Sequence, residues 1–167
     1  MAALSNYLES GLLHHIFKGQ TFSAPSVIAI GLSSGVVVDV NGVPTPTGTY
    51  DAATGGTCGE LSTTAGDSSA NGYGRLNLGD PASLGATTWH YDADDHAQGS
   101  GVIRNSGQLV FSTALQDWGW VSGVYIFDNA TVGDGNVLMH ATLDNPRIIY
   151  KGDNVKFDYK SLEISFD

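Results

Sequence analysis

The segment "HYDADDHAQG", residues 90–99, holds the residues of this chain best suited to chemistry. It combines two histidines with three aspartates, namely His90, Asp92, Asp94, Asp95 and His96. Carboxylates at alternate positions are typical of part of a calcium loop, but the distal glutamate that completes such a loop is missing. Two histidines six residues apart do not match zinc spacing either. A solvated loop whose aspartates cap their own turns explains the pattern better, so we predict no metal and no cofactor and keep these five residues as candidate ligands only.

A second polar segment, "DNATVGDGN" at 128–136, also has two interpretations. Asp128, Asp134 and Asn136 could surround a cation. A hairpin turn that needs positive φ at Gly133 or Gly135 explains the same residues more economically. We therefore expect a turn here.

The sequence shows no arrangement of catalytic groups. Glycoside hydrolysis needs two carboxylates that face each other. The three glutamates fall on a predicted helix (Glu9), in a loop (Glu60) and on an exposed strand face (Glu163). Cys58 has no neighbouring base, and neither a nucleophile elbow nor a phosphate-binding loop is present. We predict no catalytic residues and a non-enzymatic protein.

Two tryptophans two positions apart could form a binding platform. Trp118 and Trp120 should share one face of an extended strand with Ser122, Val124 and Ile126. Exposed aromatic rings can stack on sugars, whereas large aromatics are usually mostly buried. We favour packing in the core or between subunits over ligand binding.

Residues 4–18 show the one convincing helical pattern. Its apolar stripe follows i+4 spacing and consists of Leu4, Leu8, Leu12 and Ile16. Ser5 and an Asn6–Glu9 capping box compete as the N-terminal cap, and Gly19 gives a stop signal. A helix of this length is only marginally stable in isolation. We therefore expect it to pack on its own sheet or on a neighbouring copy.

From residue 26 the hydrophobic period changes to two, which predicts strands. "VIAIGL" at 27–32 fits a strand buried on both faces, and 155–159 and 162–167 fit half-exposed antiparallel strands. "KGDN" at 151–154 is expected to be a turn. Further strands are predicted at 74–78, 101–104, 108–113, 120–127, 137–143 and 148–150.

This pattern predicts a mainly β fold in a single domain, residues 1–167. We expect an N-terminal helix in 1–19 and a jelly-roll-like antiparallel β-sandwich in 20–167. Long loops are expected at about 34–71 and 79–100, and loops of that length are usually functional or mobile.

Composition and charge exclude several classes of function. Only 14% of the 167 residues are charged and 22 are glycine, which favours short strands and tight turns. The net charge of −10 disfavours binding to nucleic acid or to an anionic membrane surface. No apolar stretch reaches the roughly 18 residues of a membrane span, and the N-terminus lacks signal-peptide features. With one cysteine the chain can form no internal disulfide, and we expect synthesis in a reducing cytoplasm.

The order of motifs resembles a family of short tailed-bacteriophage virion proteins, the tail fibre-like proteins. An N-terminal helix ("LSNYLE") is followed by "APSVIAIGL" at 24–32, then by Glu60 and "GYGR" at 72–75, where Gly74 replaces an alanine. The rest of the pattern is "LVFSTALQDWG", "YIFDNATVGDGNVL", "KGDNVKF" and "LEISFD". The chain departs from the family in a lengthened loop at 33–59 and in the His/Asp-rich 88–98.

The resemblance implies a non-enzymatic β-rich subunit of a phage particle, made in the host cytoplasm. Its expected partners are two further copies of itself (a homotrimer), other virion proteins and a host-surface glycan. We expect Arg75 to pair with an acidic group or a backbone carbonyl, and Tyr73 to pack with its hydroxyl bonded. The predicted binding or assembly residues are Leu8, Leu12, Ile16, Tyr73, Arg75, Trp118 and Trp120. A tail fibre or baseplate role is preferred; a capsid decoration (cement) protein and a carbohydrate-binding module are the alternatives.

Overall fold

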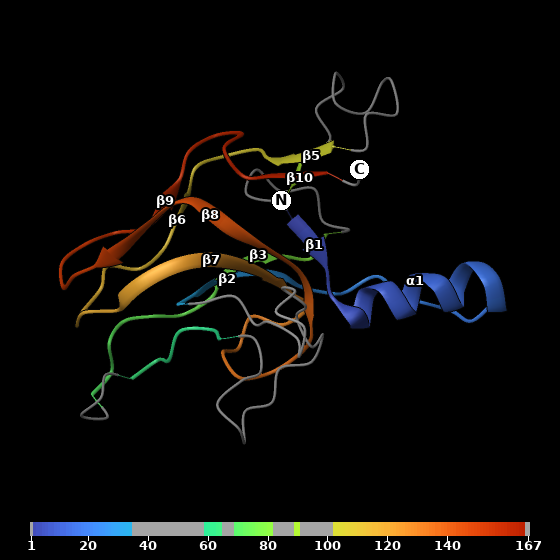
Figure 1. The fold of residues 1–167 in the computed structure, drawn as a ribbon, viewed down its shortest axis with the longest axis horizontal. Helices are drawn as coiled ribbons and strands as arrows, with labels where there is room; N and C mark the ends of the chain where they lie inside the picture. The colour runs from blue at the N-terminus through green and yellow to red at the C-terminus, as the bar shows by residue number, and fades with distance from the viewer. Residues whose placement is uncertain (1, 35–58, 65–68, 82–88, 91–101, 166–167) are drawn as a thin grey trace.

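The structure, a computed structural model shown in Figure 1, describes residues 2–34, 59–64, 69–81, 89–90 and 102–165. In this part the chain is mainly β, with antiparallel sheets and one helix near the N-terminus. The predicted fold class is confirmed. The jelly-roll connectivity and the single-domain boundaries stay predictions.

The largest sheet has five antiparallel strands in the order β1-β8-β7-β2-β3. The strands are β1 (Ala2–Leu4), β8 (Val137–Ile149), β7 (Gly119–Phe127), β2 (Ile28–Ser33) and β3 (Leu76–Gly79). Two smaller sheets are ordered β10-β5-β4 and β6-β9. Their strands are β10 (Glu163–Ser165), β5 (Val102–Asn105), β4 (Trp89–His90), β6 (Leu109–Val110) and β9 (Lys156–Phe157).

The small sheets lie on one side of the large sheet, which makes a two-layered body (Figure 1). The main hydrophobic cluster joins β2, β7 and β8 to the segments around β6 and β9, through side chains such as Leu32, Val124 and Phe111. A second cluster joins Ile126 of β7 to Ile164 of β10. Because Tyr125 and Phe127 alternate with these residues along β7, they belong to a third cluster on the other face.

β8 is one long strand, although the sequence predicted two separate strands at 137–143 and 148–150. Thr142 pairs with Gly123 and Arg147 pairs with Val121, so residues 143–146 lie opposite Ser122 alone. This large bulge accommodates Pro146, which has no N–H to offer a neighbouring strand. The turn formers in "LDNP" therefore mark a bulge within the strand and not its end.

α1 (Asn6–Lys18) begins at Ser5, which settles the choice between the two predicted caps. The Ser5 side chain accepts the Leu8 N–H at 3.1 Å and donates to the Val137 carbonyl. Gly19 ends the helix in the left-handed conformation, with φ 64°. The prediction was wrong for Leu4, which lies in β1, because backbone pairing with Met139 of β8 holds it extended.

α1 packs on the sheet only through its first turns. Leu8 is buried in the second cluster, and Leu12 is half-buried beside it. Phe22, in the chain segment after the helix, lies so close to Gly11 that a Cβ there would be 2.4 Å from the ring. The rest of the helix extends away from the sheets (Figure 1).

The two predicted turns are present. Gly152 in the 151–154 turn has φ 93°, and both Gly133 (φ 94°) and Gly135 (φ 76°) have positive φ in the 128–136 turn. The Asp128 carboxylate accepts the backbone N–H of Asn136 at 2.6 Å and its side-chain amide at 2.8 Å. The polar residues of this segment thus hold the turn together, as the economical interpretation expected.

Candidate functional site

Glu60 and Arg75 form an ion pair whose two side chains are fully buried, each with 0% exposure. The Arg75 guanidinium donates from Nε to Oε1 and from Nη2 to Oε2, both at 2.8 Å. Glu60 is held by backbone bridging to Ser33 at the end of β2, and Arg75 immediately precedes β3. Two parallel hydrogen bonds are the geometry that arginine forms best with a carboxylate.

Tyr73 completes this pair. Its hydroxyl donates to Glu60 Oε1 at 3.0 Å and accepts the N–H of Leu32 at 2.9 Å. Burial, followed by the nearby Glu60 charge, raises the pKa of the phenol well above its ordinary value. The expected satisfied hydroxyl is therefore observed, and it binds the second half of β2 to the segment that holds Glu60.

The third guanidinium nitrogen of Arg75, Nη1, reaches the turn at 128–136. Nη1 donates to the carbonyls of Asn129 at 2.7 Å and of Asp134 at 2.8 Å. The guanidinium carbon lies 3.3 Å from the centre of the Phe127 ring, a close cation–π contact. Arg75 thus pairs with an acidic group and with backbone carbonyls, and it fixes the turn after β7 to the start of β3.

The Glu60–Tyr73–Arg75 cluster is closed to ligands. Both Glu60 oxygens accept hydrogen bonds from within the chain, and both side chains of the ion pair are inaccessible to solvent. Such a network stabilises a unique arrangement of buried polar groups and offers no substrate a free position. We assign it a structural role.

Trp118 and Trp120 do not share a face, so this prediction was wrong. Trp118 is 8% exposed and packs edge-on against Tyr73 at 5.5 Å, whereas Trp120 is 50% exposed. Gly119 between them has φ 78°, which breaks the alternation of an extended strand. The bulge after Val121 shifts the later residues again, so that Val121 and Val124 both enter the main core.

The other predicted assembly residues are divided between the core and the surface. Leu8, Tyr73 and Arg75 are buried within the chain, and Leu12 is half-buried. Ile16, near the end of α1, is exposed, as is Trp120 on β7. Contact of any of these residues with another subunit remains a prediction.

The His/Asp-rich segment gives no site that can be evaluated. Asp92, Asp94, Asp95 and His96 lie outside the described residues, as do Cys58 and most of both predicted long loops; His90 is described only as part of β4. Among the residues that the structure describes, no group of three His, Cys, Asp or Glu side chains could hold a metal ion.

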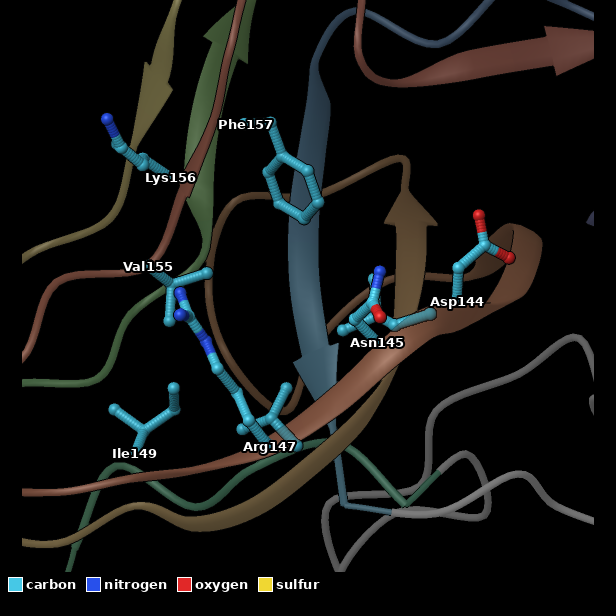
Figure 2. Close-up of a pocket in the computed structure, with 9 residues that line it drawn as sticks. Asp144, Asn145, Arg147, Ile149, Val155, Lys156 and Phe157 are labelled. Atoms are coloured by element: carbon cyan, nitrogen blue, oxygen red, sulfur yellow. The ribbon is translucent and has the colours of Figure 1, made fainter.

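A groove between β8 and β9 was missed by the sequence analysis (Figure 2). Its volume is about 300 Å³, and the bulged residues of β8 form one wall. Apolar side chains of both layers form its floor, and it is bordered by Asp144 and Asn145 from the bulge and by Arg147 just after it. Pro146 after two polar residues inside an apolar strand was the available signal, because bulges often adjoin functional sites.

Comparison with known families decides the identity. The family model described as podophage GP4 fiber I protein gp80 matches residues 36–165, more than half of the chain. The chain belongs to this family. The gp80 match includes Glu60, the "GYGR" motif and the whole β7–β8 ribbon, whereas α1 and β2 precede the matched range. No curated protein matches the chain.

Membership of the gp80 family confirms the resemblance to phage tail fibre-like proteins and gives the chain a structural role as a fibre protein and virion component. A structural fibre family suggests a non-enzymatic protein. None of the helical segments in the described ranges is long and apolar enough to cross a membrane.

Proposed function

We propose that this chain is a tail fibre subunit that assembles with copies of itself and with other virion proteins, and that takes part in recognition of the host surface. The observation that carries the proposal, beside the gp80 match, is the exposed apolar side of α1. Leu13, Ile16 and Phe17 are 55%, 67% and 77% exposed, and we call these three residues the outer α1 face.

The outer α1 face has the properties of an assembly surface. Its residues follow the i, i+3, i+4 spacing that places them together on one side of a helix. Leu8 and Leu12, on the adjoining part of the helix surface, already pack within the chain. Three large apolar side chains on a projecting helix gain free energy when another surface covers them, at about 25 cal/mol per Å² of apolar area.

Assembly is tested by size-exclusion chromatography with multi-angle light scattering. We expect the mass of a homotrimer at micromolar concentration. Phe17→Gln should shift the protein toward the 17.5 kDa monomer. The matched control is Tyr159→Gln, because Tyr159 is also a well-exposed aromatic residue but lies outside α1, between β9 and β10. A wild-type monomer, or equal effects of both variants, would contradict the proposal.

The fibre family favours the tail over the capsid as the site of attachment. Electron microscopy of virions labelled with an antibody to this chain tests this location directly. A few labels at the tail are expected; many labels distributed over the head would identify a cement protein instead. Particles that lack the chain should adsorb poorly to host cells if it takes part in recognition.

A further inference from the structure

The groove between β8 and β9 has an apolar floor with polar groups along one wall. Val121, Leu143 and Ile149 contribute to the floor from the β7–β8 ribbon, and Val155 and Phe157 close it from the other layer. Asp144 and Asn145 lie together on one side of the view, the Arg147 side chain lies on the other side, and the Phe157 ring lies above both (Figure 2). Phe157 is half-buried and lines the groove.

Arg147 gives the groove a positive charge in a strongly acidic chain. All seven Lys and Arg residues lie in the described part, and the net charge is −10. Arg75 and Arg104 are paired with glutamates, whereas Arg147 has no carboxylate within ion-pair distance among the described residues. Its side chain runs from β8 toward Val155 on the opposite wall (Figure 2). A guanidinium that has no carboxylate partner among the described residues and lies beside an apolar floor is suited to a carboxylate or phosphate group on a partly apolar ligand.

Lys156 borders the groove but contributes little charge to it. Its ammonium is directed away from the other labelled side chains (Figure 2) and lies 3.6 Å from the Asp158 carboxylate. The positive charge is therefore concentrated at Arg147, and the Asp144 carboxylate at the other end offers hydrogen-bond acceptors to a ligand. This polarity orients any ligand that carries both an anionic group and hydroxyl donors.

We propose that the β8–β9 groove binds a saccharide residue that bears one anionic group. The anionic group pairs with Arg147, the apolar face of the sugar ring lies against Phe157 and the floor, and ring hydroxyls donate to Asp144 and Asn145. The volume suits one pyranose unit, at the lower end of the size of ligand pockets. This inference rests on the proposed role in host recognition and identifies the chemistry that would be recognised.

The test is a titration of the full chain, ¹⁵N-labelled, with D-glucuronic acid, glucose 6-phosphate and D-glucose. The three sugars share one ring and differ at C6, so they separate a carboxylate, a phosphate and a neutral group. We expect millimolar binding of at least one anionic sugar, with amide shifts confined to residues 143–149 and 155–157, and about tenfold weaker binding of glucose. Equal affinity for all three sugars, shifts elsewhere, or no binding would overturn the proposal.

Arg147→Gln tests whether Arg147 is the group that binds the anionic part of the sugar, and Lys151→Gln is its matched control. Both residues are exposed and both variants remove one positive charge, but Lys151 lies in the turn after β8 and does not line the groove. Arg147→Gln should weaken binding of the anionic sugar about tenfold and leave glucose unchanged, whereas Lys151→Gln should alter neither. If Arg147→Gln instead changes the oligomeric mass and not sugar affinity, the groove is an interface between copies and the proposal fails.

Phage adsorption distinguishes failure of this inference from failure of the proposed function. Particles with Arg147→Gln should adsorb less well if the groove reads the host surface. If Arg147→Gln abolishes sugar binding but the particles still adsorb normally, the role in host recognition is contradicted. The groove would then still be a sugar-binding site. Absence of sugar binding would overturn the inference, while assembly would still be decided by the light-scattering experiment.

Discussion

Glu60 and Arg75, fifteen residues apart in sequence, form a two-bond ion pair with no solvent access. The pair joins the segment that bridges to β2, the start of β3 and the turn after β7. Desolvation of two charges is unfavourable, so such a pair persists only where further hydrogen bonds complete it. Tyr73 and two backbone carbonyls provide those bonds here.

Glu60→Gln should destabilise the fold by about 3 to 5 kcal/mol, because it leaves a buried guanidinium without its counter-ion. The matched control is Glu163→Gln, which breaks the Arg104–Glu163 pair at 27% and 49% exposure. That change should cost at most about 1 kcal/mol, because solvent screens the pair. Urea unfolding measures both values. Similar small losses would show that the Glu60–Arg75 pair is not buried in solution.

Tyr73→Phe should reduce the free energy of unfolding by about 1 to 3 kcal/mol, since it removes the donor to Glu60 and leaves the Leu32 N–H without an acceptor. Tyr159→Phe, on an exposed side chain, should change the free energy of unfolding by less than about 0.5 kcal/mol.

The contribution of Tyr73 should also depend on pH. Burial in the folded state raises the pKa of Tyr73, so the folded state favours the protonated phenol. Above the ordinary pKa of about 10 only the unfolded chain loses this proton. The difference in the free energy of unfolding between wild type and Tyr73→Phe should therefore shrink as the pH rises past 10. A difference that stays constant over this pH range would contradict the prediction.

The sequence predicted the elements that depend on local signals. Ser5 and Gly19 were predicted correctly as the ends of α1, because capping and positive φ are local properties. The hydrophobic period of two located β2 and β7. The buried role of Tyr73 and the pairing of Arg75 followed from their chemistry, but Glu60 as the partner could not be selected, because the contact depends on sheet registration.

The sequence failed where backbone geometry changes the register. The two tryptophans were assigned to one face because strict alternation was assumed, and the positive φ of Gly119 was not visible in the pattern. The turn formers in 143–146 suggested a strand end, since a bulge and a turn use the same residue types. The groove depends on this bulge and on β9 from the other layer, so it could not be found from periodicity.

Gly31→Ala should destabilise the protein by about 1 to 3 kcal/mol through overpacking. A Cβ at Gly31 would lie 2.7 Å from the Phe127 ring and 2.8 Å from Glu60 Oε1, so it would press on the ion-pair cluster. Gly74→Ala is the matched control, because nothing lies within 4 Å of its added Cβ. Gly74→Ala should be neutral or stabilise by up to about 1 kcal/mol. Thermal unfolding of both variants measures the contrast, and equal losses would show that space around Gly31 is not limiting.

His140 should make the fold less stable in mild acid. It is buried on β8 beside Tyr125, its Nε2 has no hydrogen-bond partner among the described residues, and burial lowers its pKa below 6.5. Below pH 6.5 the unfolded chain therefore binds a proton that the folded chain resists, so the free energy of unfolding falls as the pH falls. Urea unfolding at pH 7 and pH 5 should show a smaller decrease for His140→Phe than for wild type. His15→Phe, at an exposed position on α1, should keep the wild-type decrease. The same decrease in all three proteins would mean that other groups cause the acid sensitivity and that His140 protonates freely in the folded chain.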